Sequence, residues 1–126
     1  MSILIDCHLR EKMTHDAIVF PITYFDNELA ALPNRTGPLH WHPEFEIATA
    51  DSGVLDFQVG QKHLTLEAGD RIFVNGNILH GMKQLSGDVP DLMPNIVFSG
   101  VVVAPETSVI YQKYIQPISV CDVLPF

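Results

Sequence analysis

The sequence predicts an all-β domain, either a sandwich or a closed barrel, on three observations. Short runs of β-branched, aromatic and aliphatic residues recur along the chain, and clusters of glycine, proline or asparagine separate them about every eight to ten residues. The chain has 126 residues, which suits a single domain with a sizeable core. It also lacks a repeat of fixed period.

The expected strands follow from local patterns of side chains. Residues 54–59 are typical, because Leu55, Phe57 and Val59 alternate with polar side chains, as in a strand with one buried face. The pair Gly60-Gln61 then predicts a tight hairpin turn. By the same reasoning, strands are expected over residues 17–25, 39–50, 54–59, 62–66, 71–74, 78–84 and 95–103, with loops over residues 26–38 and 85–94.

The end of the chain has a different pattern, which predicts a helix. Residues 105–108 supply helix-capping chemistry, and Val109, Ile110 and Tyr114 can share one helical face that packs within the domain. Pro117 is expected to stop this helix. We therefore expect residues 1–126 to form one domain, with residues 105–126 as a helical and linker segment.

The charge balance excludes one class of function. The formal net charge is −8, and the seven basic residues are scattered along the chain. Binding of nucleic acid needs clustered basic side chains that neutralise phosphates. The sequence therefore predicts that the chain by itself does not bind duplex DNA at physiological salt.

Two further features bear on the cellular location. Cys7 and Cys121 make no metal-binding spacing, and reduced thiols are the simplest interpretation. The N-terminus has no signal-peptide pattern, and no apolar run is long enough to span a membrane. A cytoplasmic protein is therefore expected.

The stretch LHWHPEFEI, residues 39–47, concentrates the chemistry of the chain. Side chains two apart on a strand point the same way, so His40, His42, Glu44 and Glu46 would share one face. Trp41, Phe45 and Ile47 would share the opposite, buried face, while Ala48 and Ala50 would leave room beside the ionisable groups. This pattern is typical of the wall of a pocket.

A second segment, residues 66–80, carries a Gly-Asp turn, a short strand and an Asn-Gly-Asn turn before His80. A barrel can bring this histidine opposite the first strand. His40, His42, Glu46 and His80 would then offer three imidazoles and one carboxylate, a set that suits Zn, Ni, Mn, Fe or Cu. For a small-molecule sensor, a metal-free polar pocket lined by these side chains is the favoured interpretation, and a metal is optional.

These segments resemble the two motifs of the cupin family. His40, His42, Glu46 and Gly53 match the spacing of the first motif, and Gly69-Asp70 through His80 is similar to the second, although Asn75 and Asn77 replace its proline and glycine. The resemblance implies a double-stranded β-helix, or jelly-roll barrel, with a short C-terminal helical segment.

A narrower resemblance covers about residues 15–120. LHWHPEFEI, VNGNILH and the tail IYQKYIQP together look like the N-terminal domain of AraC-type transcription regulators. The resemblance implies a non-enzymatic, effector-sensing and dimerising domain that binds a sugar or other small polar metabolite. DNA would then be bound only by a helix-turn-helix region absent from these residues.

Two alternatives stay open at this stage. A metal-dependent cupin enzyme, such as a dioxygenase or isomerase, fits the same histidines and Glu46, although the sequence identifies no acid or base beside the metal. In a sensor, His40, His42, Glu44, Glu46 and His80 would line an effector pocket, with Glu44 towards the solvent at its rim. His8, His15 and His63 are expected on the surface, and Trp41 in apolar packing.

Overall fold

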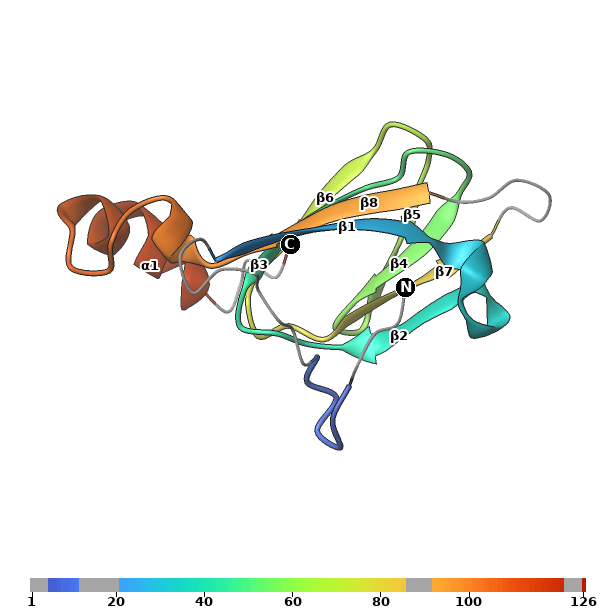
Figure 1. Ribbon diagram of the computed structural model, residues 1–126, viewed down its shortest axis with the longest axis horizontal. Helices are drawn as coiled ribbons and strands as arrows, with labels where there is room; N and C mark the ends of the chain where they lie inside the picture. Colours follow the sequence, from blue (N-terminus) through green and yellow to red (C-terminus); the bar gives the residue numbers. More distant parts are fainter. Residues whose placement is uncertain (1–4, 12–20, 86–91, 122–125) are drawn as a thin grey trace.

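The computed structural model describes residues 5–11, 21–85, 92–121 and 126. Two antiparallel four-stranded sheets lie face to face and enclose a core, as Figure 1 shows. One sheet has the strand order β1-β8-β3-β6 and the other has the order β2-β7-β4-β5. The predicted all-β jelly-roll barrel with a short helical C-terminal segment is confirmed.

The strands are short, and their bounds agree with the sequence pattern best in the middle of the chain. They are Ile22–Glu28 (β1), Thr36–His40 (β2), Phe45–Thr49 (β3), Leu55–Val59 (β4), Lys62–Leu66 (β5), Arg71–Val74 (β6), His80–Gln84 (β7) and Leu92–Phe98 (β8). The β4–β5 hairpin turns at Gly60, whose φ of 58° lies in the left-handed region that glycine adopts without strain.

The hydrophobic core fills the space between the sheets. Leu55 and Phe57 of β4, Val74 of β6 and Met93 of β8 are almost completely buried there. Ala48 and Ala50 belong to the same buried cluster. The structure therefore places both alanines within packed core, and the expectation that they border open space is corrected.

The predicted strand over residues 39–50 is divided in two. β2 ends at His40 in one sheet and β3 begins at Phe45 in the other, so the intervening residues cross between the layers. Strict alternation is lost over this crossing. Trp41, within the crossing, is only half-buried. Ile47 lies on the outer face of β3 and is 39% exposed, whereas Phe45 on the same face is buried. The expectation of one continuous buried face over Trp41, Phe45 and Ile47 is therefore wrong.

The region before the crossing also differs from the expected loop. β1 extends to Glu28, and two 3₁₀ turns, Leu29–Ala31 and Pro33–Arg35, lead into β2. Part of the first predicted strand, residues 17–20, lies outside the described residues. The last predicted strand, residues 95–103, begins earlier, at Leu92, and ends at Phe98 before a 3₁₀ turn over Gly100–Val102.

The C-terminal segment is helical, but Pro117 does not stop it. A π-helical turn, Tyr111–Ile115, passes into the helix Gln116–Ser119 (α1), and the N–H of Gln116 donates to the carbonyl of Tyr111. Pro117 therefore lies in the first turn of α1, where its missing N–H costs little.

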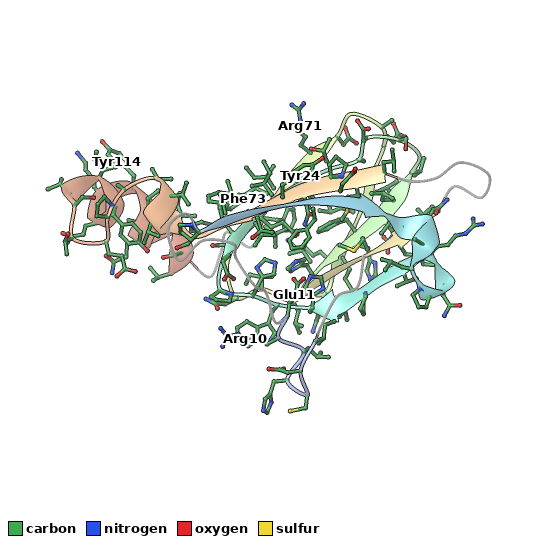
Figure 2. The ribbon with its side chains drawn as sticks, viewed as in Figure 1. Arg10, Glu11, Tyr24, Arg71, Phe73 and Tyr114 are labelled. Carbon is green, nitrogen blue, oxygen red and sulfur yellow. The ribbon has the colours of Figure 1, made fainter. Side chains whose placement is uncertain are left out.

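The same segment does not bury its apolar side chains as expected. Val109, Ile110 and Tyr114 are all more than half exposed, and Figure 2 shows Tyr114 on the helical segment beyond the end of the barrel. The expectation that this face packs within the domain is therefore wrong. Among the described residues, no helix is long and apolar enough to cross a membrane.

Candidate metal centre

Three imidazoles from two adjacent strands and the following crossing meet between the sheets. His40 closes β2 and pairs directly with His80, the first residue of β7, while His42 lies in the crossing that leads to β3. The ring centroids of His40 and His80 are 4.4 Å apart, and those of His42 and His80 are 4.9 Å apart. All three side chains are almost completely buried.

Each imidazole is oriented by a backbone carbonyl. The Nδ1 atoms of His40, His42 and His80 lie 2.7, 3.0 and 2.8 Å from the carbonyl oxygens of Pro38, Glu44 and Ile78. A carbonyl oxygen only accepts a hydrogen bond, so each Nδ1 carries the hydrogen. In the neutral rings the lone pair is then on Nε2, which is the arrangement of a metal-binding histidine with its outer partner in place.

The free ring nitrogens are directed towards one another. One ligand atom from each of His40, His42 and His80 can be chosen so that all three lie within 4.8 Å of one another. Among the described residues, Nε2 of His42 and Nε2 of His80 are buried without a well-directed hydrogen bond. Buried polar atoms without a partner are costly, and a cation between these nitrogens would satisfy them. The residues present therefore fit a divalent transition metal.

Glu46 extends this cluster from β3 in the opposite sheet. Its Oε2 lies 3.2 Å from Nε2 of His80, and its Oε1 lies 3.9 Å from Nε2 of His42. Burial by itself would raise the pKa of Glu46, but the contact with His80 and the neighbouring imidazoles lowers it overall. Burial would likewise lower the pKa of His80, whereas the Glu46 carboxylate raises it. Without a metal, these two residues therefore form a buried ion pair.

Asn95 of β8 holds the carboxylate of Glu46. Its buried side-chain amide donates a hydrogen bond to Oε1 of Glu46. Sequence reasoning missed Asn95, because a single polar residue in an otherwise apolar strand gives no motif. Its position opposite Ala48, two residue pairs away from Glu46, follows only from the strand register.

Glu44 does not share the inward face with the histidines. Its side chain is half-buried, and its Oε2 lies 3.9 Å from Nδ1 of His42, on the side of the ring away from the cluster. Its backbone carbonyl contributes to the site, because that oxygen accepts a hydrogen bond from Nδ1 of His42 and orients the ring. His63 and His8 are exposed as predicted, and His15 lies outside the described residues.

A second residue that the sequence did not indicate is Glu11. It lies in the N-terminal hairpin, and its Oε2 is 3.5 Å from Nε2 of His40. Burial and the nearby charge of Glu46 raise the pKa of Glu11 to about 7. No spacing motif connects it to His40, because the two segments meet only through tertiary contacts.

The turn before β7 packs tightly against the first histidine segment. The N–H of Asn77 donates to the carbonyl of His42 at 2.8 Å. A Cβ added at Gly76 would collide with the carbonyl oxygen of Pro43, a backbone atom that has no alternative rotamer. Glycine is therefore required here by close approach of the backbone.

Gly76→Ala is expected to destabilise the metal-free chain by about 1–3 kcal/mol, because the new methyl group overpacks this contact. The matched control is Gly60→Ala, which meets open space and introduces only the strain of a positive φ. Urea denaturation of both variants tests the idea. Equal losses of stability would show that close packing at Gly76 is unimportant.

Acid should weaken the metal-free fold through His40. Burial, and then the charge of His80, lower the pKa of His40 from 6.5 to about 4. Between these pH values the unfolded chain binds a proton that the folded chain does not, so this contribution to stability is present above 6.5 and is lost as the pH falls towards 4. His40→Gln should therefore flatten the decline over this range.

Denaturant titrations between pH 4.5 and 7 in the presence of a chelator measure this effect. Glu11 acts in the opposite direction, so the comparison is made between variants and not on the wild type alone. His63→Gln, at an exposed site, is the control. An unchanged slope in His40→Gln would refute the assignment.

Two antiparallel sheets that enclose three buried, clustered histidines define the chain as a small β-barrel domain with side chains that can hold a metal ion. Residues 29–90 match the family described as "Cupin domain", and the two antiparallel sheets have the cupin fold. Comparison with curated proteins finds no match.

Solved structures support the same fold. A cupin 2 conserved barrel domain protein from Salinispora arenicola is 19% identical, with a TM-score of 0.56, over 81% of this chain and 85% of that one. An uncharacterised protein with a double-stranded β-helix domain from Klebsiella pneumoniae is 24% identical, with a TM-score of 0.56, over 65% of this chain and 66% of that one. An RmlC-like cupin from Shewanella frigidimarina is 16% identical, with a TM-score of 0.54, over 63% of this chain and 67% of that one. At these identities the likeness concerns the fold alone.

Proposed function

We propose that this chain is the effector-sensing domain of an AraC-type transcription regulator, and that its cupin barrel binds a divalent transition metal which helps to orient a small polar effector. His40, His42, His80 and Glu46 are the proposed metal ligands. The observation that carries the metal site is the fixed orientation of the three imidazoles, whose Nδ1 atoms are all engaged by carbonyls. In this proposal the chain binds its small molecule and does not transform it.

A bound metal would act as a Lewis acid towards an oxygen atom of a sugar or other metabolite. The residues of the chain supply the rest. The backbone carbonyls of Pro38, Glu44 and Ile78 hold the imidazoles in one orientation. Asn95 fixes Glu46, and Glu44 contributes polar surface at the rim of the site.

The sensor proposal rests on the resemblance of three segments to AraC-type regulators, and one contact in the structure supports it. The side-chain amide of Asn75 donates to the carbonyl of Ile118 in α1 at 2.7 Å. Asn75 also accepts from the N–H of Gly76, which packs against Pro43 beside His42. The C-terminal segment is therefore attached to the turn that adjoins the histidine cluster, which is a physical connection that a sensor needs.

The exposed apolar side chains of the C-terminal segment support dimerisation in the longer protein. Val109, Ile110, Tyr114 and Val120 offer surface that a second copy would cover. Sedimentation of the full-length protein at tens of micromolar tests this proposal. A strictly monomeric protein would contradict it. The proposed location is the cytoplasm, as for other regulators of transcription.

Two measurements test the sensor proposal as a whole. The reading frame should continue past Phe126 into a helix-turn-helix region, and a stop codon there would refute the regulator. Elemental analysis of tag-free protein should detect about one transition metal for each chain. Less than a tenth of an equivalent, with no uptake from added Zn²⁺ or Mn²⁺, would refute the metal site.

A metal-dependent cupin enzyme is the second candidate, and Glu11 favours it. A carboxyl group whose pKa is raised to about 7 beside the histidine cluster is suited to transfer a proton near neutral pH. An isomerase or dioxygenase would convert many equivalents of its substrate, whereas a sensor would bind one equivalent and release it unchanged. Repeated turnover of a bound metabolite by the metal-loaded chain would therefore decide for the enzyme.

A further inference from the structure

We propose that Glu11 is a second carboxylate ligand of the metal centre, so that three imidazoles and two carboxylates would hold a divalent ion and the effector would bind as a further ligand. This inference rests on the proposed metal site and adds a ligand from a part of the chain outside the two histidine motifs. In Figure 2, Glu11 points from the N-terminal hairpin towards the interior between the sheets, whereas Arg10 points to the side.

The N-terminal hairpin, residues 5–11, is an ordered unit. Oδ1 of Asp6 accepts from the N–H groups of His8 and Arg10 at 2.8 and 3.0 Å. The N–H of Asp6 donates to the carbonyl of Arg10 at 2.9 Å, and Ile5 pairs with Glu11 in an antiparallel bridge. The hairpin therefore fixes the backbone from which the Glu11 side chain starts.

The hairpin is also attached to the segment that carries the first two histidines, and Trp41 makes the attachment. Its carbonyl accepts from the N–H of Glu11, and its own N–H donates to the carbonyl of Leu9, both at 2.9 Å. Its indole Nε1 donates to the carbonyl of His8 at 2.9 Å. Because Trp41 lies between His40 and His42 in the chain, these bonds set the position of Glu11 relative to the cluster.

The two carboxylates approach different imidazoles of the cluster. Glu46 contacts His80 and His42, whereas Oε2 of Glu11 lies 3.5 Å from Nε2 of His40. Both reach the Nε2 edge of the rings, which is the edge that the carbonyl contacts at Nδ1 leave available. The Glu11 side chain is 11% exposed, so it is largely removed from water.

The charge of the cluster supports a divalent cation with both carboxylates as ligands. Three neutral imidazoles and two ionised carboxylates carry a formal charge of −2, and burial of such a charge without compensation is costly. A divalent ion balances it fully. The set of three nitrogen and two oxygen donors suits ions such as Mn²⁺, Fe²⁺, Co²⁺ and Ni²⁺, which accept more than four ligands.

The alternative is that Glu11 only contacts Nε2 of His40 and positions that ring. Cobalt absorption separates the two roles, because the visible spectrum of bound Co²⁺ reports its coordination number and donor set. Loss of a positioning contact would weaken binding and leave the coordination number unchanged. Loss of a ligand would change the spectrum as well.

The experiment uses the whole tag-free chain after treatment with a chelator. Titration calorimetry measures the affinities for Co²⁺ and Mn²⁺, and absorption measures the cobalt spectrum, in wild type, Glu11→Gln, Glu11→Asp, Glu46→Gln and Glu67→Gln. Glu67 is exposed in the β5–β6 turn and is the charge-matched control. Glu11→Gln should lower both affinities by about tenfold or more and alter the cobalt spectrum, whereas Glu67→Gln should change neither.

The other outcomes overturn one proposal or both. If Glu11→Gln binds as wild type does while Glu46→Gln binds weakly, the metal site stands and the role of Glu11 is refuted. An affinity loss with an unchanged cobalt spectrum also refutes ligation by Glu11. If wild type takes up neither ion, the metal centre itself is refuted, and this inference with it. Circular dichroism checks that each variant is folded. If Glu11→Gln is unfolded, Glu11→Asp takes its place in the comparison.

Discussion

His80→Ala is expected to lower the affinity of the chain for a divalent transition metal by at least about 100-fold, since loss of an outer-shell partner alone costs 10–100-fold. His80 is completely buried in the middle of the cluster, and its ring lies within 5 Å of both other imidazoles, at 4.4 Å from His40 and 4.9 Å from His42. Its removal therefore deletes one ligand and also leaves Glu46 without its closest cationic partner.

Competition against a chromogenic chelator measures this loss with Zn²⁺ or Ni²⁺. His63→Ala is the control, because His63 lies on the outer face of the barrel and pairs with Asp56 at 2.8 Å. Binding in His80→Ala within a few fold of wild type would mean that the metal is held elsewhere. Protons compete with metal for imidazole nitrogen, and the Glu46 carboxylate raises the pKa of His80, so the wild-type affinity should already fall as the pH drops below neutral.

Phe57→Ala is expected to cost about 3–5 kcal/mol of the free energy of unfolding, the largest effect of a single substitution on stability that we predict. Phe57 is completely buried in the core cluster between the sheets. Its ring stacks with that of His80 at a centroid distance of 6.3 Å and an angle of 9°. The substitution therefore removes core volume directly beneath the proposed metal centre.

Phe73→Ala is the matched control for Phe57→Ala. Phe73 is only half-buried and points outward from β6, where Figure 2 shows it on the outer side of the sheet. Its loss should cost distinctly less stability. Urea denaturation, followed by the emission of Trp41, the single tryptophan, measures both variants. Equal losses would contradict the assignment of Phe57 to the core face, and a larger loss in Phe73→Ala would show that the two faces have been assigned backwards.

Phe45→Ala is a third phenylalanine substitution whose loss of stability can be compared with those of Phe57→Ala and Phe73→Ala. Phe45 is buried, yet it lies outside the core cluster and packs against Phe73 and Phe98 at centroid distances of 5.6 and 5.7 Å. It also lies beneath the C-terminal segment, since a Cβ at Gly100 would meet Phe45, Tyr111 and Ile115. The sequence correctly predicted that Phe45 is buried, but only the structure identifies these neighbours.

The sequence by itself predicted the class of fold and the four central residues of the cluster. Regular alternation over residues 54–59 and the turn at Gly60 specify a hairpin through local forces, and the structure has β4, β5 and their turn at those residues. His40, His42 and Glu46 stand close together in the chain, so their proximity in space needed little tertiary information. The approach of His80 to these residues was predicted from the barrel that the strand pattern implies and from the likeness of its segment to a second motif.

Tertiary structure alone decided where the strand LHWHPEFEI is interrupted. Alternation predicts one face for His40, His42, Glu44 and Glu46, but the chain changes sheets between His40 and Phe45. A crossing between layers rotates the backbone, so the period of two is lost there. Glu44 consequently leaves the inward face, while Glu46 returns to it at the start of β3.

Tertiary structure also decided which distant residues complete the site. Asn95 reaches Glu46 through the register of β8 on β3, and Glu11 reaches His40 through the hydrogen bonds of the N-terminal hairpin to Trp41. Neither residue has a local signal, because a lone carboxylate or amide is common on any surface. Their roles depend on burial and on neighbours far away in the chain, which local patterns of sequence do not encode.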